Sequence, residues 1–158
     1  FGGPRRVLEI NSPIMALDLR KYGLVENKTF KLRWPSLPSN LYRHFIRGYF
    51  DGDGSFSLHK SKCKSPDLRF SVVSNKIFLR GMQAFLVKKL GLSFNKIYDT
   101  GKDRRCGALQ YGGTKQTLSI AKFLYAQGGD CLLRKKGVVR NYIIRYGSRL
   151  GHALPWAA

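Results

Sequence analysis

The hydrophobic residues of this chain change their spacing from one stretch to the next, and each change marks a predicted element. Over residues 41–52 they recur at helical intervals. One face of this predicted helix carries Leu41, Phe45, Gly48, Tyr49 and Gly52. Residues 55–64 and 67–74 instead alternate between apolar and polar, which is typical of half-buried strands. The Ser-Pro-Asp turn at 65–67 between them predicts a hairpin.

A similar succession of patterns occurs farther along the chain. It predicts an amphipathic helix, a second hairpin and two more helices, at residues 76–90 (ending at Gly91), 93–99 with 106–112, 114–127 (capped by Thr114) and 131–147. The order after residue 40 is αββαββα, which predicts an α+β fold with antiparallel strands on one side and helices on the other. We expect three parts: an N-terminal extension at 1–38, this core at 39–147 and a C-terminal tail at 148–158.

The N-terminal extension carries its own patterns. Residues 12–22 predict a short helix, with Ser12 at its N-cap. Residues 28–34 alternate between polar and apolar, which favours a strand. A linker containing two prolines follows, and its Ser39 or its Asn40 can cap the helix that begins next.

The composition narrows the class of partner. The chain has 29 lysines and arginines against nine acidic residues, a net charge of +20 in 158 residues, and its 43% hydrophobic residues are enough for a core. Uncompensated like charges repel, so we expect a polyanion partner. Nucleic acid is the first candidate, and ribosomal-type RNA binding and acidic membrane surfaces are the alternatives. No apolar run approaches ~20 residues, so we expect no segment that spans a membrane.

The spacing of cysteines and histidines argues against a zinc site. Cys63, Cys106 and Cys131 lie far apart without a CxxC pair, and the three histidines show no metal-ligand spacing. Unpaired thiols are typical of a reducing, intracellular compartment. Whether that compartment is the cytoplasm or nucleoid or an organelle stays open.

Two of the nine acidic residues lie together at the end of the helix predicted at 41–52. The stretch FIRGYFDGDG places Asp51 and Asp53 among glycines. Gly48 and Gly52 lie four residues apart on one ridge, where missing side chains let a second helix approach closely. The alternative is that these glycines only bend or end the helix. An aspartate at a helix C-terminus is unfavourable without compensation, so Asp53 is either a turn residue or a ligand of a cation.

The segment IRGYFDGDG (46–54) resembles the LAGLIDADG motif of the homing endonucleases. WPSLP precedes it, and the basic LLRKK (132–136) follows the third helix of the core. The resemblance covers residues 22–147, and a second copy of the motif is not visible. In that family, chains with a single motif form homodimers around paired motif helices, so the resemblance implies a homodimer of the intron-encoded type. The interface residues that this implies are Phe45, Gly48, Tyr49 and Gly52.

The resemblance implies a site-specific DNA endonuclease. Its double-strand break at a long, nearly palindromic site would come from phosphodiester hydrolysis, with Mg²⁺ or another divalent cation such as Mn²⁺ as cofactor. Asp53 and the carbonyl of Gly52 are the implied metal ligands, while Asp51 is more structural. The implied catalytic residues are Asp53, Lys135 (with Arg134 and Lys136 as alternatives) and a polar residue at the end of the second strand, near Ser74 and Asn75.

The predicted sheet is a saddle whose outer face can bind double-stranded DNA. If the apolar residues of the first hairpin point to the helices, the alternating polar residues point away from them. The DNA-binding residues expected from this alternation and from the family's register are Ser57, His59, Ser61, Arg69, Ser71, Lys96, Tyr98, Arg104 and Gln110. The basic residues expected to contact phosphates are Lys60, Lys62, Lys64, Lys102 and Arg105.

Two other functions fit part of the pattern. A non-catalytic nucleic-acid binder of the same fold, either an RNA maturase that assists intron splicing or a DNA-binding regulator, needs the basic face but not Asp53. A basic ribosomal-type protein would explain the charge but not the Asp-Gly-Asp-Gly stretch. The retained acid therefore favours the enzyme.

Overall fold

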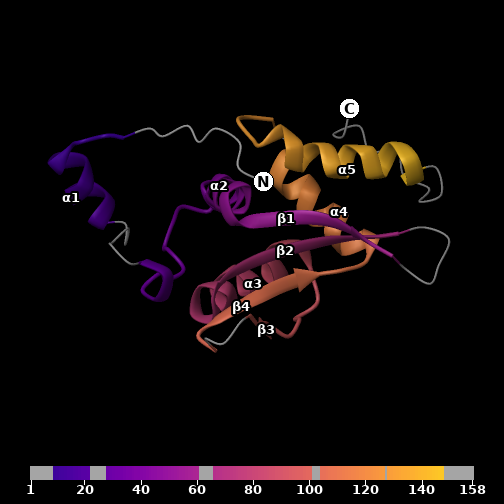
Figure 1. The fold of residues 1–158 in the computed structure, drawn as a ribbon, viewed down its shortest axis with the longest axis horizontal. Coiled ribbons are helices and arrows are strands. Elements are labelled where there is room, and N and C mark those ends of the chain that lie inside the picture. Colours follow the sequence, from indigo (N-terminus) through magenta and orange to yellow (C-terminus); the bar gives the residue numbers. More distant parts are fainter. Residues whose placement is uncertain (1–8, 22–27, 61–65, 101–103, 127, 148–158) are drawn as a thin grey trace.

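The computed structural model describes residues 9–21, 28–60, 66–100, 104–126 and 128–147, drawn in colour in Figure 1. The N-terminal extension contains α1 (Pro13–Lys21) and a short 3-10 helix, η1 (Lys28–Phe30). The elements that follow are α2 (Tyr42–Asp53), β1 (Gly54–His59), β2 (Asp67–Asn75), α3 (Lys76–Leu90), β3 (Tyr98–Asp99), β4 (Cys106–Tyr111), α4 (Thr114–Tyr125) and α5 (Leu133–Tyr146). The predicted αββαββα order is confirmed from α2 to α4, and α5 follows it as the predicted last helix. The predictions for Ser61, Lys62, Cys63, Lys64, Lys102 and the tail at 148–158 lie outside the described residues.

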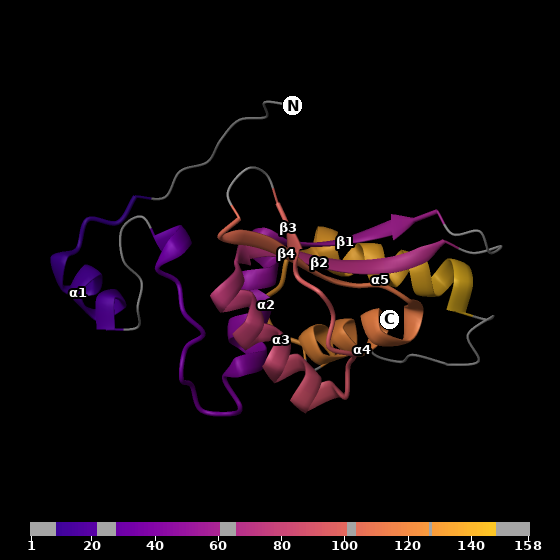
Figure 2. The ribbon, with the colours of Figure 1, turned by 90° about the horizontal axis from the view of Figure 1, so that it is seen from below.

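The four strands form one antiparallel sheet in the order β1-β2-β4-β3. Ser55 of β1, Ser71 of β2 and Gln110 of β4 lie opposite one another, so these three strands share one register. In Figure 2 the strands lie above α2, α3 and α4, which cover one face of the sheet, while α5 lies beside β1 in Figure 1. No helix of the described ranges covers the other face. This is the α+β arrangement that the sequence predicted.

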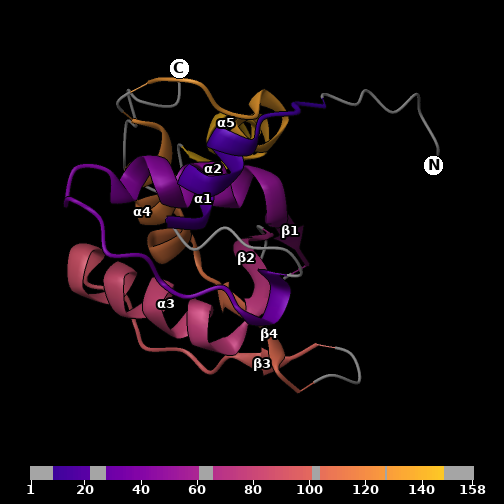
Figure 3. The ribbon, with the colours of Figure 1, turned by 90° about the vertical axis from the view of Figure 1, so that its left-hand side faces the viewer.

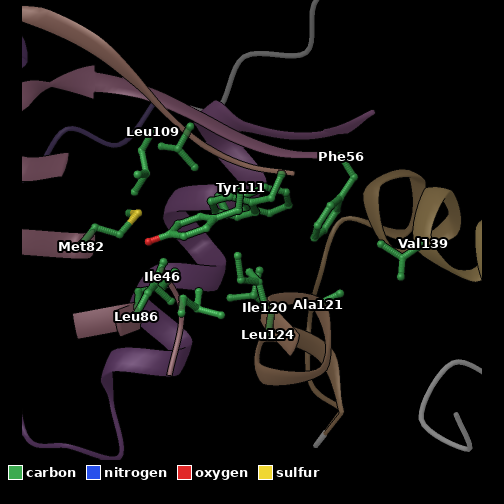
Figure 4. Packing of buried hydrophobic residues seen from close by; sticks show 14 of the residues in the cluster. Ile46, Phe56, Met82, Leu86, Leu109, Tyr111, Ile120, Ala121, Leu124 and Val139 are labelled. Atoms are coloured by element: carbon green, nitrogen blue, oxygen red, sulfur yellow. The ribbon is translucent and has the colours of Figure 1, made fainter. Parts of the chain in front are cut away.

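The hydrophobic core fills the space between the sheet and the helices. Strand residue Phe70 and helix residues Met82 and Leu124 are fully buried. Figure 4 shows side chains from both layers pointing toward one another, with the ring of Tyr111 among them. Phe50 of α2 stacks on Phe70, with ring centroids 4.9 Å apart and ring planes 11° apart. Burial of these rings therefore fixes α2 against the centre of the sheet.

The start of α2 differs from the prediction. Leu41 occupies the N-cap position in a helical conformation, and no side chain caps the helix. The predicted caps, Ser39 and Asn40, are therefore wrong. A turn takes their place, because the Leu41 N–H donates to the Pro38 carbonyl at 2.9 Å and leads directly into the helix.

The predicted cap of α4 is wrong as well. Gly113 occupies the N-cap position with a φ of 81°, a conformation that favours glycine. Thr114 is the first helical residue, and its hydroxyl lies 2.8 Å from the Tyr142 hydroxyl of α5. Its side chain therefore links two helices. The predicted end of α3 is confirmed, since Gly91 follows it with a φ of 65°.

The strand predicted at 28–34 is wrong. The segment forms η1 and then continues without strand pairing to any described residue. The Asn75 side chain, at the end of β2, donates to two carbonyls of this segment at 2.9 and 3.0 Å. Its alternating apolar residues pack at separate places: Phe30 lies 3.7 Å from the Arg105 guanidinium, and Leu32 packs against the core. The alternation thus comes from separate side-chain contacts rather than from a strand.

Trp34 attaches the linker to the core. Its indole stacks on the Tyr42 ring, with centroids 5.4 Å apart and planes 1° apart. A Cβ added to Gly81 of α3 would lie 2.3 Å from the Trp34 Cβ, so only glycine leaves room for this contact. The chain before α2 is therefore held between α2 and α3.

The first helix, α1, forms close to the predicted residues 12–22. The Met15 N–H donates to the Ser12 hydroxyl at 3.3 Å, as expected for an N-cap. None of the residues of α1 is buried. Among the described residues, none of the helices has the length and apolarity needed to span a membrane.

β3 contains only Tyr98–Asp99, which is less than the predicted strand at 93–99. Asn95 explains the difference. Its backbone carbonyl accepts from the Gln83 side chain at 2.7 Å. Its side-chain amide donates to the backbone carbonyl of Gln110 at 2.8 Å. These side-chain bonds replace strand pairing before Tyr98.

Candidate functional site

α2 has one face in the core and one open face. Ile46 and Phe50 are fully buried and hold the helix on the sheet. Gly54 turns the chain directly into β1, and a Cβ there would lie 2.1 Å from the Phe50 ring. On the other face, a Cβ added to Gly48 or Gly52 would meet nothing within 4 Å. These two glycines therefore make no close helix contact within the described chain.

The open face of α2 borders a hollow of about 440 Å³, which we name the α2 hollow. Its lining residues come from α2, η1, the end of β2 and the start of β4, and they are Thr29, Leu32, Phe45, Gly48, Tyr49, Gly52, Asp53, Val73, Ser74 and Cys106. The structure thus brings together the predicted interface residues, the predicted metal ligands and the predicted catalytic residue Ser74. Lys135 is not among the lining residues.

Asp53 is the last residue of α2 and is exposed. The carbonyls at a helix C-terminus carry partial negative charge, so this carboxylate lies where a cation is favoured. Carboxylate and carbonyl oxygens are the ligands that Mg²⁺ and Mn²⁺ prefer, so Asp53 and the Gly52 carbonyl fit part of such a site. The described residues contain no cluster of three acidic, histidine or cysteine side chains. Within the described residues, Asp53 and the Gly52 carbonyl are therefore only part of a complete site.

Tyr49 connects α2 to the end of β2. Its hydroxyl donates to the Ser74 hydroxyl oxygen at 2.7 Å. Burial raises the pKa of Tyr49, and the nearby charge of Asp53 also raises it. Tyr49 therefore remains a donor, which leaves the proton of Ser74 available to an acceptor in the α2 hollow.

Asp51 connects the end of α2 to the two helices that follow β4. Its carboxylate accepts from the Tyr125 hydroxyl of α4 at 3.2 Å and from the Leu132 N–H before α5 at 3.0 Å. Burial raises the pKa of Tyr125, and the Asp51 charge raises it further, so this hydroxyl stays protonated. Asp51 thus has the structural contacts that the motif implied.

Lys135 lies beneath the same helix end and is only 5% exposed. Its ammonium donates to three carbonyls, those of Phe50 at 2.7 Å, Asp51 at 2.9 Å and Gly54. These bonds use all three ammonium protons. Burial lowers the pKa of Lys135, and the charge of Arg134 also lowers it. Lys135 therefore caps the end of α2. The predicted role as a catalytic lysine requires a free ammonium, and in this structure the ammonium is bonded to the three carbonyls.

The two alternatives to Lys135 are placed differently. Arg134 is exposed and Lys136 is half-buried in the first turn of α5. Neither side chain makes a hydrogen bond to another described residue. Arg134 directly precedes Lys135, whose ammonium binds carbonyls at the end of α2.

Sequence reasoning missed Arg47, which is 7% exposed on α2. Its guanidinium donates to the Gly128 carbonyl at 2.6 Å, and Gly129 follows with a φ of 88°. The sequence did contain a signal for this residue, because Arg47 interrupts the apolar run of the motif. Sequence reasoning also missed Cys106 in the α2 hollow. Its position depends on the pairing of β4 with β2, which alternation alone does not define.

The outer face of the sheet, opposite the helices, carries four of the predicted DNA-binding residues in register. Ser57 lies opposite Arg69, and Ser71 lies opposite Gln110. The strand neighbours of the last three are buried, so these side chains point away from the core. The predicted alternation is confirmed along β2, whereas in β1 burial stops alternating after Phe56, because Leu58 is 50% exposed.

The remaining predicted face residues lie at the edges of the sheet. His59 is exposed at the end of β1. Tyr98 of β3 is 53% exposed, while its neighbour Ile97 packs against the core, so the two residues point to opposite faces. Lys96 and Arg104, which flank β3, are also exposed.

Comparisons with known proteins identify the family to which the chain belongs and structures that share its fold. Residues 40–122 match the family model of the LAGLIDADG-like domain. The reverse gyrase of Methanocaldococcus jannaschii is 34% identical over 89 residues, which are 56% of this chain and 5% of that protein. The chain thus spans a small fraction of the length of this relative.

Two solved structures resemble the chain over most of its length. The archaeal intron-encoded homing endonuclease I-Vdi141I, complexed with DNA, has a TM-score of 0.52 at 15% identity and 72% coverage of both chains. The meganuclease I-SmaMI, bound to uncleavable DNA, has a TM-score of 0.51 at 18% identity, with 72% of this chain and 40% of that chain covered. At these identities the likeness shows a shared fold.

Proposed function

The chain belongs to the LAGLIDADG-like domain family, and on that premise we propose that it is a site-specific DNA endonuclease of the homing type. Its reaction is a double-strand break at a long, nearly palindromic site, by hydrolysis that depends on a divalent cation. The observation that carries the proposal is Asp53, an exposed carboxylate at the end of a helix with an open face. A protein that only binds nucleic acid has no need of a carboxylate there.

Two copies of the chain complete the proposed site. The open ridge at Gly48 and Gly52 lets a second α2 approach at backbone distance. The α2 hollow beside this ridge gives room for side chains of the second copy. A two-fold axis between the helices brings the two Asp53 carboxylates together. The proposed homodimer therefore completes a cation site of which the described residues of one chain supply a part.

The donor set suits Mg²⁺ or Mn²⁺, held by Asp53 and the Gly52 carbonyl of each copy. When bound, such an ion polarises a phosphodiester and lowers the pKa of a bound water. The other residues of the chain position this site. Asp51 and Lys135 fix the end of α2 through their hydrogen bonds, and Tyr49 ties the helix to β2.

We assign the neutralisation of phosphate charge to Arg134. Lys135 has no free proton for a phosphate, because its three protons are bonded to carbonyls. Arg134 is exposed and directly precedes Lys135, whose ammonium lies at the end of α2. An arginine can donate two parallel hydrogen bonds to a phosphate, which suits this role.

The outer face of the sheet is the proposed contact with double-stranded DNA. Arg69, Ser71 and Gln110 carry hydrogen-bonding groups in adjacent strands, and strands of this kind can enter the major groove and read base edges. The net charge of +20 supplies the attraction to phosphates. Both solved structures described above contain DNA, which supports this use of the fold.

A pooled library of partly palindromic duplexes of about 20 bp, roughly two helical turns, tests the proposal. Wild type, Asp53→Asn and Asp130→Asn are incubated with Mg²⁺ or with a chelator, and both the bound duplexes and the cut ends are sequenced. Asp130 is an exposed acid outside α2, so Asp130→Asn is the matched control. We expect wild type and the control to make recurrent double-strand cuts, which disappear with chelator and with Asp53→Asn.

The other outcomes point to the alternative functions. Selection of one duplex without cuts by wild type would contradict the endonuclease and favour a DNA-binding regulator. No selection among the duplexes would contradict specific DNA recognition. The next substrate would then be structured RNA, as expected for a maturase.

A further inference from the structure

A second hollow, of about 410 Å³, lies in the helical layer and is lined by residues of α2, α3 and α4. We name it the Arg43 pocket. Three cations line it, one from each helix: Arg43, Lys89 and Lys122. None of the described lining residues is acidic, and Leu90 and Phe123 supply apolar walls. The described lining is therefore basic without a compensating carboxylate, which favours an anion as its occupant.

Arg43 has a buried donor without an acceptor. Its Nη1 is inaccessible to solvent and has no hydrogen-bond partner in the described part of the chain. Its Nη2 lies 3.5 Å from His44 Nε2, at the limit of a hydrogen bond. Burial lowers the pKa of Arg43, and the charge of Arg47 lowers it further. A buried donor left unpaired is rare in native structures and calls for an explanation.

We propose that the Arg43 pocket binds a phosphate group, carried either by a free phosphate compound or by a nucleic-acid strand. The planar guanidinium of Arg43 matches the oxygens of a phosphate, and the ammonium groups of Lys89 and Lys122 complete the charge. The apolar walls receive the remainder of the ligand. A bound phosphate gives the three cations a counter-charge, and it offers an acceptor to the Arg43 Nη2, whose contact with His44 is at the limit of a hydrogen bond.

The Arg43 pocket is separate from the proposed DNA face. Figure 3 shows α2, α3 and α4 on one side of the strands, whereas the outer face of the sheet lies on the other. Arg43 is in the first turn of α2, and Asp53 is its last residue, so pocket and proposed nuclease site lie at opposite ends of one helix. A duplex on the outer face does not reach the pocket. The ligand is therefore additional to the DNA substrate, and its test does not depend on cleavage.

Titration of inorganic phosphate into the full chain, with chloride adjusted to keep the ionic strength constant, tests the proposal. Binding is followed by ¹H–¹⁵N NMR of arginine side chains and by thermal unfolding. We expect Arg43→Met and Lys122→Met each to weaken phosphate binding by about tenfold, because each removes a charged hydrogen bond. Lys88→Met is the matched control, since Lys88 is exposed next to Lys89 but does not line the pocket. It should change binding less than about twofold.

Equal phosphate binding by wild type and both pocket variants would overturn the proposal, because the effect would then be general screening of the net charge of +20. Lys122 is exposed, so Lys122→Met keeps the test decisive even if Arg43→Met fails to fold. A short single-stranded oligonucleotide distinguishes the two sources. Weaker oligonucleotide binding by Lys122→Met than by Lys88→Met identifies a strand phosphate as the ligand. Unchanged oligonucleotide binding, together with lost phosphate binding, identifies a free phosphate compound.

Discussion

Replacing Lys135 by methionine removes three hydrogen bonds from the end of α2 while keeping an apolar stem of similar length. The ammonium donates to the carbonyls of Phe50, Asp51 and Gly54. The Phe50 carbonyl also accepts from the Gly54 N–H, so Lys135 is its second donor, whereas other carbonyls in the last turn of a helix depend on partners from elsewhere. In Lys135→Met these groups lose that partner inside the core. We therefore expect the variant to be less stable than wild type.

Two opposing contributions set the size of this effect. A hydrogen bond from a charged group contributes about 1.5–3 kcal/mol, so three bonds would give roughly 4.5–9 kcal/mol by simple addition. Burying an ammonium in a site that is 5% exposed costs several kcal/mol, and methionine avoids that cost. We expect a net loss of about 3 kcal/mol. At about 2–4 °C per kcal/mol, Tm falls by roughly 6–12 °C.

Urea and thermal unfolding of Lys135→Met measure this loss. Arg134→Met and Lys136→Met are matched controls. Each removes a neighbouring charge, but neither wild-type side chain makes a hydrogen bond to another described residue that the substitution would break. Both should unfold within about 0.5 kcal/mol of wild type. If Lys135→Met unfolds at the wild-type urea concentration but no longer cuts DNA, the capping role is refuted and Lys135 contacts phosphate instead.

Three other variants test separate contacts. Gly48→Leu should leave the fold of one chain intact, because a Cβ there meets nothing within 4 Å, but it should abolish dimers in sedimentation velocity; a dimer of unchanged affinity would contradict the paired helices. Gly54→Ala should lower the free energy of unfolding in urea by about 1–3 kcal/mol, because its Cβ would lie 2.1 Å from the Phe50 ring. The hydrogen bond from Lys76 holds the pKa of Asp99 below its ordinary 3.8. The stabilisation of the fold by this pair is therefore present above pH 3.8 and is lost as the pH falls through the lowered pKa. An NMR titration should show this low midpoint in wild type and its return toward 3.8 in Lys76→Gln, and equal midpoints would argue against the pair.

The spacing of apolar residues predicted the helices and strands after residue 40, because the apolar face of each of these elements packs against one neighbouring layer. Leu68, Phe70 and Val72 alternate along β2, and all three are buried against the helices. Gly91 ends α3 in the left-handed conformation that a helix C-terminus favours. Asp53 was predicted from the motif and Ser74 from the wider family resemblance, and the direct passage from α2 into the sheet brings both to the α2 hollow.

Where the spacing of apolar residues predicted a strand that does not form, side-chain hydrogen bonds bind the backbone instead. At 28–34 the Asn75 side chain binds carbonyls that a strand would have paired with another strand. Before β3, Asn95 makes the corresponding bonds. Lys135 lies in a run of basic residues, and its sequence neighbours do not indicate that it alone is buried. Only the packing of α5 against α2 and β1 reveals its role.

The cleavage rate of Asp53→Asn on the duplex selected by wild type, measured at equal occupancy of the duplex, tests the central claim most directly. We predict that the variant binds this duplex as wild type does but cuts it at least about a thousandfold more slowly, because a cation site that contributes several kcal/mol to the reaction is lost. Cleavage at the wild-type rate would contradict the account, since the carboxylate at the end of α2 would then have no part in the chemistry.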